Sequence, residues 1–543
     1  MKIIKIIAFL CLTFLSATNI TLEFIQSKPK GIARDFYIWR FLQDPKTSLQ
    51  EAITAYDLVY KKTPKIEKLI AQKGYIHDLP KEVACKQMAF EKLKESDGEC
   101  LAFGLKLSNI LSLPLSQTQE IIKKLQDVDP IMAQEVQILT LKNPLHSILA
   151  SQNAKIFSEI FYELNLSQRQ AIFNQNIPAD QLALIANQND ANFNKMLQYI
   201  LLSDRFDKFK NSILQAPIQK VEDKILLLIG ISQAQANNPK KAQEYFSLIL
   251  KNSKNQLFID KALFWQYLVS KDKNYLQSLA QSPVVDLYSI YATQTLGVKP
   301  AYSIISKLDD LKDAPPSFDI TNPFEWQILR DALIKIPTGN DLKPILDEKL
   351  AHLQSSPHYA YMLNRIKKYK GNYFLMPYAS SLTWKNTHQK ALTYAIAKQE
   401  SNLLPALVSS SYALGMMQIM PFNLKPFAKA MGKKDATLDD LFHPQNALEY
   451  GRFYLAELED EFKHPLFVAY AYNGGPGFWR RTLGKKTLFI KNRKYEPWLS
   501  LELIPYEESK NYGQIVLANY IIYQQILGKE INLQSFLNQT LVN

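Results

Sequence analysis

The chain has 543 residues, a length that predicts about three domains rather than one compact core. Its 17 glycines are sparse, eight before Glu400 and nine after it, so most of the chain lacks the turn signals that an all-β protein requires. The net charge of +13 suits an anionic partner, but no basic motif interleaved with aromatic residues is present. We therefore expect a mainly α-helical protein that does not bind nucleic acid.

Residues 1–17 have the layout of a secretory signal peptide. Two lysines precede an apolar stretch at residues 6–15, and Ser16-Ala17 follows it. The stretch is too short to span a membrane. We expect cleavage near Ala17 and export of the mature chain.

Two cysteines, Cys85 and Cys100, remain after the expected cleavage. An oxidising compartment favours a disulfide between them. Closing so short a loop would stabilise the fold by roughly 3 kcal/mol. Two buried free thiols are the alternative.

Residues 18–283 read as a succession of short amphipathic helices. Residues 240–250 and 256–268, for example, pair an Ala-x-x-Tyr-Phe pattern with a second apolar helix. Helical hairpins of this kind bury their faces by stacking on one another, which predicts an α-superhelical domain. After Pro315-Pro316 a further helix is expected at 322–336, within a helical linker domain at 284–370. A last domain would then occupy residues 371–543.

The last domain contains the candidate catalytic group, Glu400. The apolar helix expected at residues 388–400 places Leu392, Ile396 and Glu400 on one face. Burial and the negative end of the helix dipole would both raise the pKa of Glu400 toward that of a general acid at neutral pH. A solvated glutamate at a frayed helix end is the alternative. A short strand containing Gly415 is expected to follow.

Four motifs follow in order over about 110 residues. They are Glu400-Ser401, Gly415-Met-Met-Gln-Ile-Met-Pro421, Ala471-Tyr-Asn-Gly-Gly475 and Ile504-Pro-Tyr-Glu-Glu-Ser509. Together they resemble the soluble lytic murein transglycosylases. The resemblance implies a fold that is mainly all-α, with an N-terminal α-superhelix, a helical linker and a C-terminal lysozyme-like α+β domain.

The resemblance also implies an activity. Enzymes of this family cleave the β-1,4 bond between N-acetylmuramic acid and N-acetylglucosamine in peptidoglycan and leave 1,6-anhydromuramic ends. Glu400 would be the only catalytic acid and base. An ordinary glycosidase needs a second carboxylate, and the next acidic residues after Gly415 are Asp435, Asp439 and Asp440.

Other positions carry over from the family as substrate-binding residues. Ser401 and Ser409 match polar residues near the acid, Gln418 and Met420 match the segment that lines the glycan cleft, and Tyr472 and Asn473 match a loop near the reacting sugar. Glu508 matches the acidic residue of the last motif. Structural roles are the alternatives: capping for the serines, core filling for Met420 and Tyr472, a turn amide for Asn473 and a helix-start charge for Glu508. Gly513 stands where the family has an aliphatic residue, which puts the packing of the last motif in doubt.

Two other functions are compatible with these motifs. A lysozyme-type hydrolase would use water in place of the muramyl C6 hydroxyl, and an inactive scaffold would only bind peptidoglycan. The seven histidines lack metal-ligand spacing, so we expect no metal and no cofactor. We expect a periplasmic monomer that acts on peptidoglycan glycan strands, with other cell-wall enzymes as candidate partners.

Overall fold

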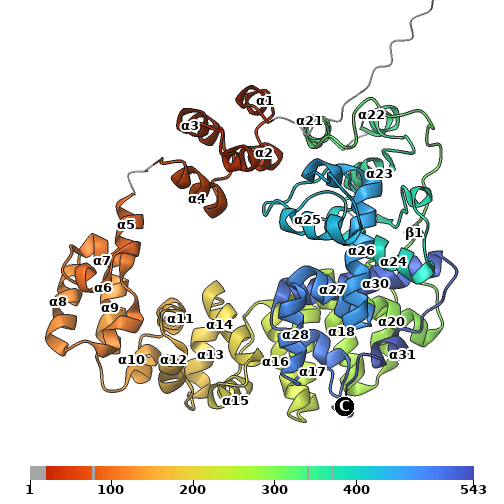
Figure 1. The fold of residues 1–543 in the computed structure, drawn as a ribbon. Helices are drawn as coiled ribbons and strands as arrows, with labels where there is room; N and C mark the ends of the chain where they lie inside the picture. The colour runs from red at the N-terminus through yellow and green to blue at the C-terminus, as the bar shows by residue number, and fades with distance from the viewer. Residues whose placement is uncertain (1–19, 76–79, 339–341, 369–370, 543) are drawn as a thin grey trace, which may run out of the picture. The chain divides into compact units, whose positions relative to one another are not determined.

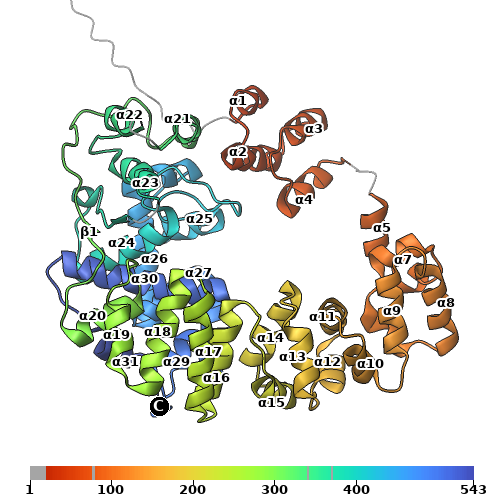
Figure 2. The ribbon, with the colours of Figure 1, turned by 180° about the vertical axis from the view of Figure 1, so that it is seen from behind.

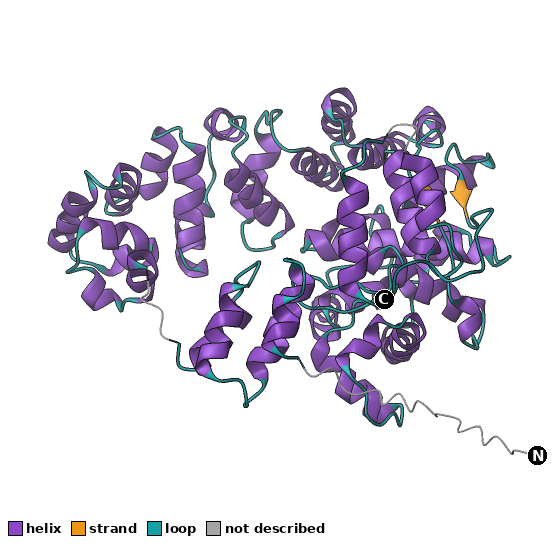
Figure 3. Cartoon of the chain, turned by 90° about the horizontal axis from the view of Figure 1, so that it is seen from above, coloured by secondary structure: helices purple, strands orange, loops and turns teal. Residues whose placement is uncertain are grey.

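The computed structural model describes residues 20–75, 80–338, 342–368 and 371–542, and helices dominate them (Figure 3). This confirms the predicted fold class. The strands in these residues are two residues long, β1 (Ile304–Ile305) and β2 (Asn372–Tyr373). None of the described helices is both long enough and apolar enough to cross a bilayer. The expected signal peptide lies outside the described residues.

The chain forms two compact units, each of which combines two separate stretches of sequence. Unit 1 consists of the described parts of residues 20–75 and 306–457, and unit 2 of residues 80–305 and 458–542. The domain boundaries expected after residues 283 and 370 stay predictions.

The helices of unit 1 come from both of its stretches (Figure 1). They are α1 (Leu22–Gln26), α2 (Ile32–Gln43), α3 (Leu49–Asp57), α4 (Pro64–Gln72), α21 (Pro323–Ile334), α22 (Leu342–Lys349), α23 (Ser356–Ile366), η2 (Ala379–Ser381), α24 (Thr387–Ser401), α25 (Pro421–Ala430) and η3 (Leu438–Phe442). Helix α26 (Pro444–Phe462) starts in unit 1 and ends in unit 2. The helix expected at 322–336 is α21, and the helix expected at 388–400 is α24.

Unit 2 begins with a long run of short helices. They are α5 (Lys81–Gln87), α6 (Phe90–Leu93), α7 (Gly98–Gly104), η1 (Leu107–Ser112), α8 (Leu115–Leu125), α9 (Pro130–Leu139), α10 (Pro144–Ala150), α11 (Ala154–Glu163), α12 (Leu166–Phe173), α13 (Ala179–Ala186), α14 (Ala191–Leu202), α15 (Asp207–Gln215), α16 (Asp223–Gln235), α17 (Pro239–Asn252), α18 (Gln256–Ser270), α19 (Lys273–Leu279) and α20 (Leu287–Leu296). Helices α16 to α20 each pack against the next (Figure 2). The predicted pair of helices at 240–250 and 256–268 is thus confirmed as α17 and α18.

The second stretch of unit 2 contributes the C-terminal helices. They are α27 (Pro465–Gly474), α28 (Pro476–Gly484), α29 (Trp498–Leu503), α30 (Glu507–Ile526) and α31 (Leu533–Asn538). Helix α20 packs against both α30 and α31, which joins the two stretches of the unit.

A buried ion pair also joins the two stretches of unit 2. The Nζ atom of Lys261 on α18 lies 2.9 Å from Oε2 of Glu502 on α29, and their side chains are 2% and 0% exposed. The Tyr288 hydroxyl donates a hydrogen bond to the same carboxylate. Desolvation alone would raise the pKa of Glu502, but the ammonium groups of Lys261 and Lys510 keep this pKa below its usual value.

A disulfide between Cys85 and Cys100 links α5 to α7, with the two Cα atoms 5.2 Å apart. The predicted pairing is therefore present, and the free-thiol alternative does not hold in this structure. Replacing both cysteines by serine should lower the free energy of unfolding by roughly 3 kcal/mol, because the cross-link no longer restricts the unfolded chain. Denaturant unfolding of the double variant, compared with the unaltered protein, measures this loss. Equal stability would contradict it.

Changing Glu502→Gln should destabilise unit 2 by about 3–5 kcal/mol, because Lys261 and Lys510 would remain buried without their counter-charge. Denaturant unfolding at neutral pH measures the loss. Glu461→Gln is the matched control, since Glu461 pairs with Arg480 at the surface of the same unit and should cost much less.

The same variant tests the direction of the Glu502 pKa shift. Because the folded-state pKa is lowered, the stabilising effect of the carboxylate is fully present above the unfolded-state pKa of about 4.5. It is lost as the pH falls through the lower folded-state pKa, where Glu502 becomes protonated. The stability difference between the two proteins should therefore shrink in acid, and a constant difference down to pH 2 would contradict the assignment.

Candidate active site

The predicted site residues fall into two groups. Unit 1 contains Glu400, Ser401, Ser409, Gln418 and Met420, and unit 2 contains Tyr472, Asn473 and Glu508. The structure brings the first five together on α24 and the loop that follows it, and the last three together on α27 and α30.

Helix α24 carries Glu400 in its last turn. The helix starts where the Asn386 side chain accepts a hydrogen bond of 2.8 Å from the Gln389 amide. It ends at Asn402, which is left-handed with φ 50°, and Leu403 is left-handed as well with φ 68°. A left-handed leucine is a strained conformation that the surrounding packing has to maintain.

The environment of α24 differs from the expected single apolar face. Its residues from Ala391 to Ala397 are all buried, on every side of the helix, because α24 runs through the interior of the unit. Glu400 follows this buried segment and is itself half-buried. The Glu400 carboxylate therefore lies where α24 passes from its buried segment toward the surface.

Ser401 attaches the end of α24 to the following loop. Its side chain is buried, and its hydroxyl lies 2.7 Å from the carbonyl oxygen of Met416 and 3.0 Å from that of Ala397. These contacts place Glu400 next to the segment that contains the second motif. The hydroxyl is committed to backbone carbonyls, as the capping interpretation anticipates.

The strand expected around Gly415 is not present. The segment has single bridges, Val408 with Leu414 and Leu414 with Ile419, in place of a ladder. The physical reason is a series of left-handed residues: Tyr412, Gly415 and Gln418 have φ values of 66°, 73° and 48°. Each of them turns the chain before a regular strand can form.

Gly415 also fills a position that only glycine can occupy. A Cβ atom there would lie 1.9 Å from the carbonyl oxygen of Leu441. The loop is therefore pressed against the backbone that precedes α26, which fixes its position on unit 1.

Two of the predicted polar residues maintain the shape of this loop. The Gln418 side-chain amide donates to the Gly415 carbonyl at 2.8 Å. The Ser409 hydroxyl accepts from the Ala413 amide at 2.9 Å. Both side chains are half-buried. Direct contact of either with substrate stays a prediction.

Met420, which was expected in a segment that lines a cleft, does line a groove, but sequence reasoning missed the part that α2 and α4 play in it. The groove has a volume of about 800 Å³ and is lined by α2, α4 and the loop, with Trp39, Lys68, Tyr412 and Phe422 among its residues. The Phe422 side chain is 70% exposed. The one signal in the sequence is the aromatic residue Phe422, which directly follows the second motif.

Helices α2 and α4 are attached to η3 and to the loop after α24 by polar contacts. Tyr37 and Arg40 on α2 both donate to Oδ1 of Asp439, at 2.8 and 2.7 Å. Lys65 on α4 donates to the Ser411 carbonyl at 3.0 Å. The N-terminal helices thus form one wall of the groove beside Met420.

In unit 2, Tyr472 and Asn473 lie in the last turn of α27 and not in a loop as expected. The helix continues to Gly474 because the turn is made one residue later, by Gly475 with φ 82° before Pro476. The Asn473 side-chain oxygen accepts a hydrogen bond of 2.8 Å from the Ser509 hydroxyl on α30. The third and fourth motifs are therefore in direct contact.

Glu508 is exposed in the first turn of α30, where the helix dipole favours a negative charge. Five residues later, Gly513 removes the doubt about this motif's packing. A Cβ atom at Gly513 would lie 2.2 Å from the ring of Tyr470, so an aliphatic residue could not fit against α27 as it is placed here. The two helices approach each other closely because this residue is glycine.

No group of three or more His, Cys, Asp or Glu side chains that could hold a metal ion occurs in the part of the chain that the structure describes. Glu400 provides a half-buried carboxylate at the end of α24, and the loop that follows carries the Ser409 hydroxyl and the Gln418 amide.

Comparison with known proteins finds a family match for the segment that contains the first three motifs. Residues 377–493 match the family described as Transglycosylase SLT domain. The soluble lytic murein transglycosylases of Salmonella typhimurium and Escherichia coli K12 are each 32% identical over 143 residues, which are 26% of this chain and 21% of each relative. The matched stretch thus spans about a fifth of the length of these curated relatives.

Solved structures are similar over a longer span at lower identity. The X-ray structure of the lytic transglycosylase Slt from Pseudomonas aeruginosa covers 94% of this chain and 84% of its own, with 16% identity and a TM-score of 0.49. The family match and the curated relatives identify the domain by sequence. Residues 377–493 of this chain therefore match the transglycosylase SLT domain, and soluble lytic murein transglycosylases are among the curated relatives to which the chain is similar.

Proposed function

We propose that this protein is a peptidoglycan lytic transglycosylase that uses Glu400 as its only catalytic acid and base. The observation that carries the proposal is the SLT domain match, which includes Glu400 and the whole loop up to Met420. The reaction cleaves the β-1,4 bond between N-acetylmuramic acid and N-acetylglucosamine without water.

The mechanism uses the same carboxyl group twice. Protonated Glu400 donates its proton to the glycosidic oxygen, and the N-acetylglucosamine leaves with this proton on its 4-hydroxyl. The resulting carboxylate then removes the proton from the muramyl C6 hydroxyl, whose oxygen attacks C1. A 1,6-anhydro ring forms and Glu400 is protonated again.

The hydrogen bonds of two acidic residues in unit 1 support a single-carboxylate reaction. A hydrolase with two catalytic carboxylates needs the second one free to act as nucleophile or base. In unit 1, Asp439 accepts hydrogen bonds from Tyr37 and Arg40, and Asp440 accepts one of 2.7 Å from the Thr437 amide. Both carboxylates already have structural partners.

The groove beside Met420 suits a glycan strand that carries acidic peptides. The aromatic faces of Trp39, Tyr412 and Phe422 can cover the apolar faces of sugar rings, and Lys68 can meet peptide carboxylates. Gln418 and Ser409 would bind the strand close to Glu400. Tyr472, Asn473 and Glu508 would stabilise the charge that develops at the reacting sugar.

We infer that the protein is exported to the periplasm and acts there as a monomer. The disulfide between Cys85 and Cys100 supports an oxidising compartment. Peptidoglycan glycan strands are the proposed substrate, and other cell-wall enzymes are proposed as partners.

Changing Glu400→Gln should lower the rate of peptidoglycan cleavage by about 10²–10⁴-fold, because glutamine can neither donate nor remove the proton. Mass spectrometry of digested cell wall measures the rate and should detect 1,6-anhydromuramic ends with the unaltered protein. Glu449→Gln is the matched control: this glutamate pairs with Lys433 in the same unit, and its loss should leave the rate unchanged.

Each alternative function predicts a different outcome of this digestion. Reducing ends in place of anhydro ends would indicate a hydrolase. Full activity of the Glu400→Gln variant would show that another group is the acid. If the unaltered protein bound the wall but released no fragments, the scaffold interpretation would replace the enzyme.

Changing Ser401→Ala should lower kcat by about tenfold to a hundredfold with little change in KM, because the end of α24 loses its attachment to Met416 and Glu400 is misplaced. Ser356→Ala is the control, since its hydroxyl also donates to a backbone carbonyl, that of Leu353 at 2.9 Å, but on α23. Steady-state kinetics with both variants measures the effect. An equal loss of kcat in the two variants would attribute the effect to general destabilisation.

A further inference from the structure

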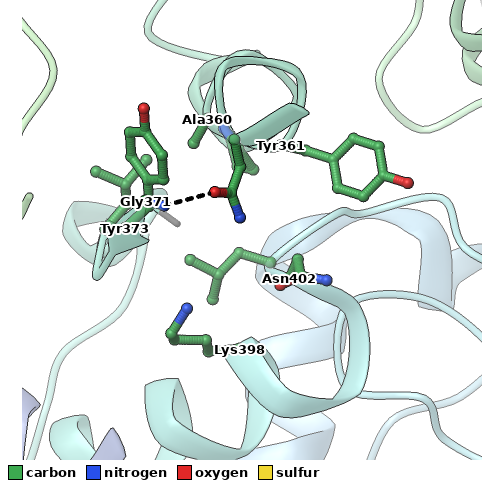
Figure 4. A pocket seen from close by; sticks show the side chains of 10 residues that line it. Ala360, Tyr361, Gly371, Tyr373, Lys398 and Asn402 are labelled. Atoms are coloured by element: carbon green, nitrogen blue, oxygen red, sulfur yellow. Dashed lines mark hydrogen bonds between the residues drawn. The ribbon is translucent and has the colours of Figure 1, made fainter. Parts of the chain in front are cut away.

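A cavity of about 280 Å³ lies in unit 1 against the last turn of α24 (Figure 4). It is bounded by α23, by the segment around β2 and by Lys398, Asn402 and Leu403 at the end of α24. Lys398 precedes Glu400 by two residues, which places the two side chains about 200° apart around the helix. The cavity is therefore on the side of α24 away from Glu400, and the proposed glycan chemistry does not use it.

The side chain of Lys398 points into this cavity (Figure 4). Its ammonium has no carboxylate or hydrogen-bond acceptor among the residues that the structure describes, and the centre of the Phe374 ring lies 4.6 Å from Nζ. Desolvation lowers the pKa of Lys398 to about 8. At neutral pH the group is still mostly charged, although its surroundings disfavour the charge.

Hydrogen-bond donors and apolar surface surround this ammonium. Asn364 lines the cavity, and its side-chain oxygen accepts from the Gly371 amide at 2.8 Å, which leaves its NH₂ group available as a donor. The amide of Asn402 is exposed at its edge. Ala360 and Leu403 contribute buried apolar surface, and none of the lining residues is acidic.

We propose that this cavity binds the carboxylate end of a short N-acylated peptide. One ammonium balances a single negative charge, whereas a dianion such as phosphate would bring a second charge, and no lining residue besides Lys398 is cationic. A free amino acid would bring its own ammonium, for which the cavity offers no acidic partner. The volume lies just below the range of about 300–1,000 Å³ that drug-sized ligands need, which limits the ligand to roughly one or two residues.

Isothermal titration calorimetry of the full chain with N-acetylalanylalanine tests the proposal, and the C-terminal amide of the same compound is the uncharged comparison. The carboxylate form should bind at least about tenfold more tightly than the amide, which corresponds to about 1.4 kcal/mol. Lys398→Met should remove this preference. Lys390→Met, on the same helix but outside the cavity, should retain it.

A second variant tests the same cavity independently, in case Lys398→Met does not fold. Ala360→Leu fills the cavity with apolar atoms and should abolish binding while Lys398 keeps its charge. Circular dichroism checks that both variants remain folded. Equal binding of acid and amide, unchanged affinity in either variant, or no binding by the unaltered protein would overturn the proposal.

Glu400→Gln separates this inference from the proposed enzyme activity. The variant should lose peptidoglycan cleavage but bind N-acetylalanylalanine as the unaltered protein does, because Glu400 faces away from the cavity. Loss of peptide binding in this variant would show that the two sites are one, and would overturn the inference without affecting the proposed reaction.

Discussion

The hydrogen bond from the Ser401 hydroxyl to the Met416 carbonyl is the contact on which the arrangement of the candidate site depends. Helix α24 is buried from Ala391 to Ala397, and two left-handed residues, Asn402 and Leu403, reverse the chain directly after it. Without a link across that reversal, the Glu400 carboxylate and the loop would each be positioned only by its own packing. The buried Ser401 hydroxyl fixes the end of α24 to the loop. Acid catalysis requires such precise positioning of the reacting groups.

Two buried lysines illustrate opposite uses of charge in this protein. Lys261 is paired with Glu502, and the pair connects two distant stretches of sequence within unit 2. Lys398 in unit 1 has no carboxylate partner among the described residues, so the charge of its desolvated ammonium is not balanced by a counter-charge. In a buried ion pair each charge offsets the desolvation cost of the other, whereas an unpaired charge next to a cavity costs stability that a ligand can recover.

The sequence predicted most of what depends on local pattern. Helices at residues 240–250 and 388–400 follow from apolar periodicity, and three of the four motifs lie in the segment that matches the SLT domain. The loop expected at Tyr472 proved to be the last turn of α27. The helix continues through Asn473 because the chain turns only at Gly475. Contacts such as that of Tyr37 with Asp439 leave no local signal, so the groove wall could not be predicted. Lys398 escaped notice because a lysine near the end of a helix usually lies in solvent.

Unit 1 is built from two stretches that are far apart in the sequence, and this affects how the protein folds during biosynthesis. Residues 20–75 pack with a stretch that begins at residue 306, and the intervening chain belongs to unit 2. A ribosome or an export channel that releases the chain from its N-terminus therefore delivers the first helices long before their partners. Apolar side chains of α1 to α4, such as that of Phe36, therefore stay exposed until residues 306–457 have been released. Nascent molecules of this protein would consequently depend on chaperones that shield such helices during this delay.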